Sequence, residues 1–338
     1  MTTETTVIRL EGAPAVPGLR ARRIRPGDET EYARMAVLVA AANRIDEIPW
    51  LPTAAHLRED VELSPGSDPA RDLLLIEVGD ELVAFGGVQR AVRDGRPVYD
   101  AWGTVHPDHR RRGIGGALLR HDLGHIRGRA IREDEGQAVV VRAHAEATET
   151  GHRALLEQSG FAIVRWFFLM RRGDLADIPA VVLPDGIEIR PVETAHHRAI
   201  FEAEAEAFRD HWGHREMTDA DFRRTYERAE LDTSLWVVGW DGDEVAGVVQ
   251  NWIWPEENAE LGVARGWHER ISVRRPWRRR GLARALTAGS LHRLRGAGMT
   301  DTMLGVDAAN QTRALGLYEG LGFEVHQRSM AYERTIGP

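Results

Sequence analysis

The sequence predicts two tandem copies of a mixed α/β domain, in which helices flank a largely antiparallel sheet. Two observations support this. Three short motifs recur in the same order at nearly the same spacing. Within each copy, strand pairs with hairpin signals accompany a single strand–helix–strand crossover, which disfavours a doubly wound parallel sheet. A chain of 338 residues suits two domains of this kind.

The repeat sets the expected domain boundaries. Each of the three motifs occurs twice, and its two occurrences are separated by 165, 168 and 162 residues in turn. The pairs are Ile24-Arg25-Pro26 with Ile189-Arg190-Pro191, Arg110–Gly115 with Arg278–Ala283, and Ser159-Gly160-Phe161 with Leu321-Gly322-Phe323. Between the copies lies a stretch rich in proline and turn residues. We therefore expect an N-terminal arm over 1–18, a first domain over 19–172, a linker over 173–185 and a second domain over 186–338.

Each element of the second copy has a local signal. Residues 187–190 form a short apolar strand, and helices follow over 193–208 and 218–231, the latter with aspartates near its start. Asp241-Gly242 predicts a tight turn between strands 234–240 and 244–252. The remaining elements are expected as strand 269–273, helix 280–296 ended by glycine, strand 302–306, helix 310–320 and strand 323–333. The first copy repeats the hairpin, with strands 73–78 and 81–88 around Gly79-Asp80.

Composition excludes several classes of protein. The 44 basic and 52 acidic side chains give a net charge of −8, so a nucleic-acid partner is not expected. Cysteine is absent, which removes disulfides, thiolate metal sites and a cysteine nucleophile, and no metal is expected. Every basic residue is arginine, so a Schiff-base or Walker lysine is excluded. The N-terminus lacks a signal-peptide pattern and no apolar run reaches membrane length, so we expect a cytoplasmic protein without membrane contact.

The second repeated mark carries the chemistry. Gly281 and Ala283 open a predicted helix, where small residues let a ligand approach the backbone. The first-turn N–H groups and the helix dipole suit a diphosphate, and Arg278, Arg279 and Arg280 add positive charge. The first copy has the same design, with Arg110, Arg111 and Arg112 before Gly113, Ile114, Gly115 and Gly116. The alternative is a helix start beside a solvated arginine run, which two matching copies make less attractive.

These residues resemble the GNAT N-acetyltransferase superfamily. The Arg-x-x-Gly-x-Gly/Ala pattern after the fourth strand is similar to its acetyl-CoA loop. The run Asn310-x-x-x-Ala314-x-x-Leu317-Tyr318-x-x-x-Gly322-Phe323 is similar to its second signature. The resemblance covers about 150 residues twice, almost the whole chain. Mycothiol synthases are one group of tandem GNAT proteins with this layout, although no separate mark of their substrate is present here.

The resemblance implies an acetyl-CoA site in each copy. The diphosphate would lie on the amides of Arg279–Ala283, and the pantetheine arm would pair with the strand edge near Ile271, Ser272 and Val273. The thioester would lie where the fourth and fifth strands of the fold splay apart. The full set of expected cofactor-binding residues adds Arg278, Arg284 and Asn310 in the second copy, and Val105 with Arg110–Gly116 in the first.

The resemblance also suggests an acid and a base for direct transfer to an amine. Tyr318 is the expected acid, because a phenol can protonate a departing thiolate. Glu269 is the expected base, placed by alternation on the same face as Ile271 and Val273, with His268 on the other face. His211 is a third candidate for the base. The first copy has Leu156 opposite Tyr318 and Thr148 opposite Asn310, so it either binds CoA without catalysis or is only structural.

The acceptor side is marked by aromatic residues. His211, Trp212, Trp252 and Trp254 are expected to line it, with Trp267 and an acidic loop of Glu256, Glu257 and Glu260 nearby. Such a set would suit a cationic amine by cation–π contact and ion pairing, or the tryptophans simply belong to the core. The expected activity is acetyl transfer from acetyl-CoA to a primary amine of a small molecule in the second domain. The alternatives are a non-catalytic acyl-CoA-binding or sensor protein and the use of another acyl-CoA. The sequence leaves the oligomeric state open.

Overall fold

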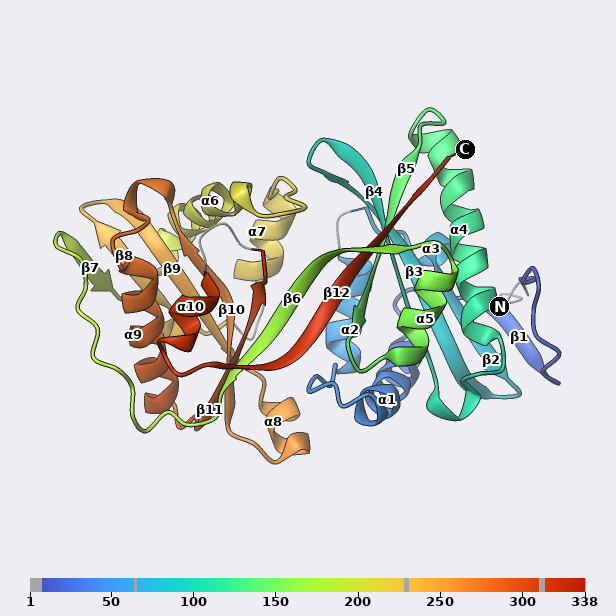
Figure 1. Ribbon diagram of the computed structural model, residues 1–338, viewed down its shortest axis with the longest axis horizontal. Helices are drawn as coiled ribbons and strands as arrows, with labels where there is room; N and C mark the ends of the chain where they lie inside the picture. Colours follow the sequence, from blue (N-terminus) through green and yellow to red (C-terminus); the bar gives the residue numbers. More distant parts are fainter. Residues whose placement is uncertain (1–7, 64–65, 228–230, 310–313, 338) are drawn as a thin grey trace. The chain divides into compact units, whose positions relative to one another are not determined.

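The computed structural model describes residues 8–63, 66–227, 231–309 and 314–337, and its chain divides into two compact units (Figure 1). Unit 1 comprises Met1–Val164 with Met330–Pro338, and unit 2 comprises Arg165–Ser329. Each unit is a mixed, largely antiparallel sheet with helices against it, as the sequence predicts. Among the described residues, no helix combines the length and apolar character needed to cross a bilayer.

Unit 1 has the strand order β1-β2-β3-β4-β5-β12, in which only β4 and β5 are paired in parallel among the registers described. Its elements are β1 (Leu19–Arg23), α1 (Glu29–Ile45), α2 (Ala54–Glu62), α3 (Pro69–Asp72), β2 (Leu73–Val78), β3 (Glu81–Arg93), β4 (Arg96–Val105), η1 (Pro107–His109), α4 (Ile114–Glu133), β5 (Val139–Glu146) and α5 (Thr150–Gln158).

Unit 2 repeats this plan with the order β6-β11-β10-β9-β8-β7. Its elements are β6 (Ala162–Arg172), β7 (Ile187–Arg190), η2 (Thr194–His196), α6 (His197–Ala207), η3 (Phe208–Asp210), α7 (Asp219–Tyr226), η4 (Thr233–Leu235), β8 (Val237–Asp241), β9 (Glu244–Ile253), α8 (Pro255–Leu261), β10 (Arg265–Val273), η5 (Arg275–Trp277), α9 (Leu282–Gly296), β11 (Asp301–Asp307) and α10 (Ala314–Glu319). The last strand, β12 (Glu324–Ile336), begins in unit 2 and ends in unit 1.

The two copies exchange their last strands, so the units do not follow the boundaries expected from the repeat. Residues 167–172 of β6 pair antiparallel with β11 in unit 2. The end of β12 instead belongs to unit 1, where Met330 and Tyr332 are fully buried in the apolar cluster beside β5. Glu333 accepts a hydrogen bond from Arg142 there at 2.7 Å. Each unit is therefore completed by the final strand of the other copy, and neither 19–172 nor 186–338 is a whole unit.

Several elements differ from their predicted limits. β10 begins at Arg265 rather than at Glu269, and α7 ends at Tyr226, before residues 228–230, which lie outside the described part. The expected acidic loop after β9 is the short helix α8, with Pro255 at its first turn. Buried Glu257 accepts a hydrogen bond from the Trp267 indole at 3.0 Å, so this side chain faces the protein interior.

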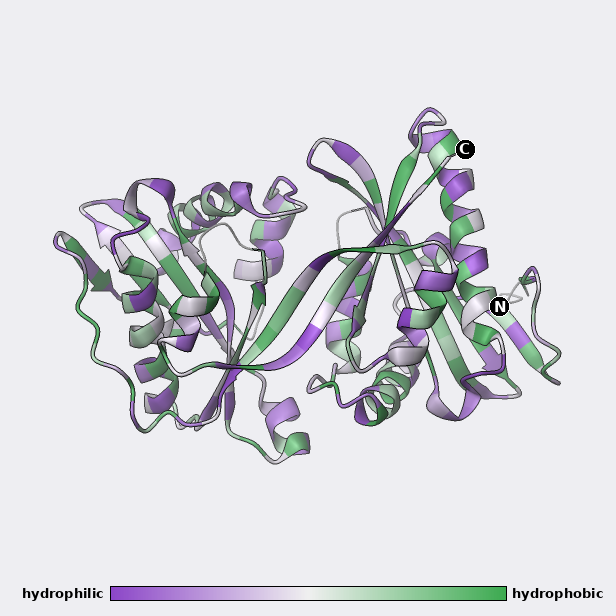
Figure 2. Cartoon of the chain, in the orientation of Figure 1, coloured by the Kyte–Doolittle hydropathy of each residue, from purple (hydrophilic) through white to green (hydrophobic). Residues whose placement is uncertain are grey.

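Apolar residues cover both faces of the sheet in unit 2. Helix α9 buries Leu282, Leu286, Leu291 and Leu294 on one face, and α6 with α7 packs around Trp236 on the other. Figure 2 shows both hydrophobic and hydrophilic residues along α4 and α9, as expected of helices with one face on a sheet. This packing holds the N-terminus of α9 just beyond the end of β10.

Candidate active site

The loop between β10 and α9 forms an open cradle for an anion. Gly281 caps the helix with φ of 82°, and Arg279 also has positive φ, at 60°. Within the described part of the chain no side chain caps this helix end, and the first bond within the helix runs from the Ala285 N–H to the Gly281 carbonyl. A Cβ added to Gly281 would meet no described atom within 4 Å. Exposed amides at an open, left-handed glycine fit the diphosphate predicted from the sequence.

The corresponding loop of unit 1 has the same backbone but is covered. Gly113 caps α4 with φ of 86°, and Arg111 has φ of 63°. A Cβ added to Gly113 would lie 3.4 Å from Cβ of Pro14 in the N-terminal arm. A Cβ added to Gly115 would lie 3.4 Å from Cδ2 of Leu155. The first loop therefore has the backbone geometry of an anion cradle, but the side chains of Pro14 and Leu155 pack against its glycines.

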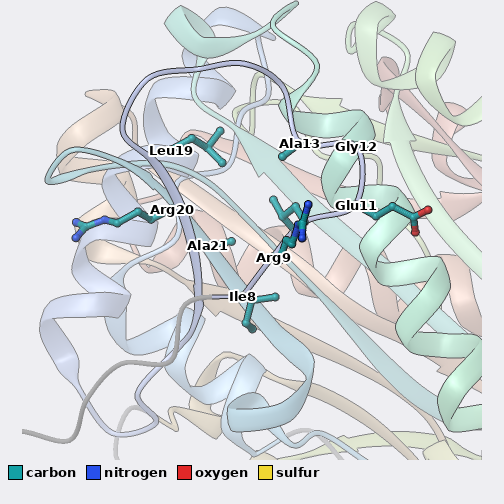
Figure 3. A pocket seen from close by; sticks show the side chains of 9 residues that line it. Ile8, Arg9, Glu11, Gly12, Ala13, Leu19, Arg20 and Ala21 are labelled. Carbon is teal, nitrogen blue, oxygen red and sulfur yellow. The ribbon is translucent and has the colours of Figure 1, made fainter.

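The arm is held in place by specific contacts. The Arg120 guanidinium on α4 donates to the Gly12 carbonyl at 2.9 Å, and the Ile8 N–H donates to the Ala21 carbonyl at 2.7 Å. Leu10 is 5% exposed and packs with Ile114. A hollow lies beneath the arm (Figure 3), lined by Ile8, Arg9, Leu10, Glu11, Gly12, Ala13, Leu19, Arg20 and Ala21. This hollow is in unit 1 and is not part of the open loop of unit 2.

The strand before the open loop diverges from its parallel neighbour. Pairing of β10 with β11 ends at His268 and Leu304, although β10 continues to Val273. Ile271, Ser272 and Val273 remain paired with β9 on their other side. Unit 1 shows the same divergence, because β4 pairs with β5 only over Val98–Asp100. The splay implied by the family resemblance is thus present, next to the three strand residues expected to bind the pantetheine arm.

A β-bulge corrects the predicted faces of β10. The register with β9 shifts between His268 and Arg270, and the extra residue reverses the alternation of side chains. His268 therefore lies on the α9 face together with Ile271, not opposite to it. Glu269 stands at the bulge with an exposed side chain. The expected shared face of Glu269 and Ile271 is wrong for this reason.

His268 is poorly suited to remove a proton. It is 3% exposed, and its Nδ1 lies 2.8 Å from the Asn251 side-chain oxygen and 2.9 Å from the Ser290 hydroxyl. Burial lowers the pKa of His268 to about 3, so the ring stays neutral but is a weak base. Glu269 and His211 are both exposed to solvent and therefore remain the candidates for the general base.

Tyr318 lies on α10 and is 7% exposed, packed edge-on against Phe323 with ring centroids 6.0 Å apart. Burial raises the pKa of the Tyr318 phenol above its ordinary value, so the hydroxyl keeps its proton at neutral pH. Leu156, its counterpart in unit 1, is 1% exposed and fills the apolar cluster there. Asn310 falls outside the described residues.

The arginines of the open loop serve different purposes. Arg278 donates to the Val273 carbonyl at 2.9 Å, to Asp210 at 2.6 Å and to the Ala207 carbonyl at 3.1 Å, so much of its guanidinium is engaged within the protein. Arg280 donates to the Asp185 carbonyl, and Arg284 to the Gly320 carbonyl. Arg278 thus connects the loop to the end of α6, a role the sequence did not reveal.

The four expected acceptor residues fall into two groups. His211 and Trp212 follow η3; Trp212 packs against Phe167 with centroids 6.0 Å apart. Burial lowers the pKa of His211, partly offset by the charge of Asp307 at the end of β11. Trp252 and Trp254 stack on one another 5.4 Å apart, and Trp252 belongs to the buried aromatic cluster of unit 2. Trp252 is therefore part of the core, as one alternative predicted.

Sequence reasoning missed a buried acid, Glu204 on α6. Its carboxylate accepts from the Gln250 amide at 2.6 Å, its other oxygen has no partner among the described residues, and neither does the buried Tyr226 hydroxyl. Burial raises the pKa of Glu204 to about 7. The available signal was spacing, because Glu204 falls four residues after Ile200 on the apolar face of the helix.

Comparisons with known proteins agree with this architecture. Residues 39–161 and 197–323 each match the family model "Acetyltransferase (GNAT) family". The chain is 30% identical over 321 residues to a mycothiol acetyltransferase of Thermobispora bispora, covering 92% of this chain and 98% of the relative. A second such protein, from Thermomonospora curvata, is 31% identical over 309 residues, covering 90% and 94%.

Solved structures give the same result. A GCN5-related N-acetyltransferase from Sphaerobacter thermophilus is 26% identical with a TM-score of 0.73, covering 96% of this chain and 98% of that one. A tandem GNAT protein from the clavulanic acid biosynthesis pathway is 20% identical with a TM-score of 0.66, covering 95% and 99%. The second likeness supports the fold alone.

Proposed function

The chain belongs to the acetyltransferase (GNAT) family and is an acyltransferase, and from this premise we propose that unit 2 moves an acetyl group from acetyl-CoA to a primary amine of a small molecule. One observation carries the choice of unit. A Cβ on Gly281, the helix-capping glycine of unit 2, would meet no described atom within 4 Å, whereas a Cβ on its counterpart Gly113 would contact Pro14. The open cradle is next to diverging strands, and Tyr318 is present in the same unit.

Acetyl-CoA would supply the activated acetyl group as a thioester. The amides at the start of α9 would hold its diphosphate, with Arg279 and Arg280 adding positive charge around the loop. The free edge of Ile271, Ser272 and Val273 would hold the pantetheine arm as an added strand. In this proposal Arg278 shapes the loop through its bonds to Val273 and Ala207 instead of binding phosphate.

The protein's part in the chemistry is to move two protons. Glu269, exposed at the bulge, would first accept a proton from the acceptor ammonium, directly or through water, because only the neutral amine has a lone pair with which to form the new C–N bond. Tyr318 would donate its proton to the sulfur as the C–S bond breaks, and the second proton that the nitrogen loses on becoming an amide would restore the phenol. Its phenol is protonated at neutral pH because burial disfavours the anion. Proton transfers of this kind contribute about 10²–10⁴-fold each.

A small-molecule acceptor is supported by the names of the relatives, which refer to mycothiol acetylation, over nearly the whole of this chain. His211 and Trp212 offer an aromatic acceptor surface beside Arg165 and Phe167. The rival proposal is a protein that binds acyl-CoA without turnover. We keep this rival because unit 1 has the same fold with the buried Leu156 at the position of Tyr318, so the fold does not require a tyrosine there.

The test is a matched pair of substitutions, Gly281→Val and Gly113→Val. Both glycines have positive φ, so each change should cost about 1–2 kcal/mol of stability by backbone strain. Only Gly281→Val should abolish acetyl-CoA binding measured by calorimetry, because its side chain enters the open cradle. Unchanged binding in Gly281→Val would refute the loop assignment.

Turnover decides between enzyme and binder. Released CoA thiol can be followed with a thiol reagent without background, because the chain contains no cysteine. Release of CoA with at least one member of a panel of small primary amines supports the enzyme. Tight binding without release for the whole panel supports the rival.

A further inference from the structure

We infer that Asp210 is a positioning residue that couples the acetyl-CoA loop to the acceptor segment, defined as residues 208–217. The inference rests on the proposed function, because it takes the open loop as the acetyl-CoA site. It adds a physical link by which acetyl-CoA bound at the loop orders the acceptor segment.

Asp210 lies at the end of η3 and receives two arginines from the loop. Arg278 Nη1 donates to one carboxylate oxygen at 2.6 Å, and Arg275 Nε donates to the same oxygen at 3.0 Å, while Arg275 Nη2 donates to the other. Together the two guanidinium groups hold the pKa of Asp210 well below its usual range. The carboxylate therefore stays charged near neutral pH, and the link does not depend on pH in that range.

Arg278 ties this carboxylate to the backbone on two sides. Its Nε reaches the carbonyl of Val273, where β10 ends, and its Nη2 reaches the carbonyl of Ala207, where α6 ends. Three rigid donors on one planar group fix direction as well as distance. The last turn before the acceptor segment and the first residues of the loop therefore move as one body.

We call the aspartate held by the loop arginine the clamp. The first copy contains the same clamp, but there no proposed acceptor residue follows the aspartate. Arg110 donates to the Val105 carbonyl at 3.2 Å and to both oxygens of Asp46, at 2.7 and 2.6 Å. Asp46 is the residue that caps the end of α1. In unit 2 the clamping aspartate is followed directly by His211 and Trp212, so the clamp is connected to the proposed acceptor surface.

The thermodynamic consequence is cooperative ordering. A ligand that fixes the loop removes freedom that the acceptor segment would otherwise lose on binding the amine. The clamp should transmit this effect, since it joins the two segments through charge-assisted bonds. Breaking it should leave acetyl-CoA bound to the loop and leave the acceptor segment unresponsive.

Hydrogen exchange with acetyl-CoA alone tests this in the full-length protein. In the wild type, saturating acetyl-CoA should slow amide exchange both in residues 274–284 and in residues 208–217. In Asp210→Asn the first region should still be protected, and protection of the second should fall at least fivefold. Asp46→Asn breaks the matching clamp in unit 1 and should leave the response of residues 208–217 unchanged.

The outcomes separate a positioning role from a structural one. Arg275→Ala removes one of the two arginines at an exposed position and serves as a milder variant if Asp210→Asn folds poorly; it should give an intermediate loss. Undiminished protection of residues 208–217 in both variants would overturn the inference. Absence of protection at residues 274–284 in the wild type would instead overturn the proposed function.

Discussion

The two loops of this protein have nearly the same backbone and different surroundings. Gly113 and Gly281 cap their helices at φ of 86° and 82°, and the arginine two residues before each glycine also has positive φ. Pro14 packs on the first, whereas no described atom would contact a side chain on the second. The comparison teaches that this loop shape belongs to the fold and recurs in both units, so that the difference between the two loops lies in what packs on them.

The comparison extends to the helix that follows the parallel strands of each unit, α5 in unit 1 and α10 in unit 2. Tyr318 and Leu156 occupy corresponding positions, and each is buried in the apolar cluster of its unit. The cluster therefore accepts either side chain, so packing alone does not require a hydroxyl. The proposed role of Tyr318 as the acid would give its hydroxyl a purpose that packing does not.

The largest expected effect tests that difference. Tyr318→Phe should lower the rate of CoA release by about 10²–10³-fold, because the acid is lost, while acetyl-CoA affinity stays unchanged. The assay is thiol release with the best amine of the panel, combined with calorimetry.

The matched control is Tyr332→Phe in unit 1. Its hydroxyl donates to Glu157 at 3.1 Å, so the substitution removes a hydrogen bond from a buried tyrosine that belongs to unit 1. It should lower the midpoint of unfolding and leave turnover intact. A Tyr318→Phe protein with full turnover would show that the two halves do not differ in this way.

Removal of the arm should make the two loops alike. Deletion of residues 1–15 in the Gly281→Val background exposes Gly113, so acetyl-CoA binding should rise from none to one site per chain. Adding Gly113→Val should abolish that site again. Calorimetric stoichiometry is the measurement.

The deletion also removes Leu10, which is 5% exposed, at a cost of about 2 kcal/mol. Arg120→Ala is the milder variant, because it only releases the Gly12 carbonyl. If neither variant binds acetyl-CoA, the first loop has lost its affinity for reasons other than the arm, and Leu155 beside Gly115 becomes the next residue to replace.

Local signals in the sequence were enough to predict the two glycine-capped helix starts and their repetition, because these depend on residue type and spacing. The roles given to Tyr318 and Glu269 came from the family resemblance and stay predictions. The strand exchange was not predictable, since β6 and β12 are equivalent strands and satisfy the same local pattern in either unit. The bulge at Glu269 reversed the faces because alternation assumes no inserted residue. The link between Asp210 and Arg278 spans 68 residues, and a charged pair at that separation has no signature in a single sequence.

Each unit also contains an almost fully buried acid whose pKa is raised by burial, Asp122 in unit 1 and Glu204 in unit 2, and these acids give the smallest predicted effect. Burial raises the pKa of Glu204 to about 7 and that of Asp122 in unit 1 to about 8. Because the unfolded carboxyl of Glu204 ionises near pH 4.5, the unfolded state releases its proton first, and stability falls as pH rises from there to about 7. Glu204→Gln cannot ionise, so its free energy of unfolding should be close to the wild type at pH 4.5 and exceed it by about 3 kcal/mol at pH 8. Urea unfolding at the two pH values measures this, with Asp122→Asn as the parallel test in unit 1. An equal loss at both pH values would mean that the Gln250 contact, and not the burial of an acid, determines the effect of residue 204.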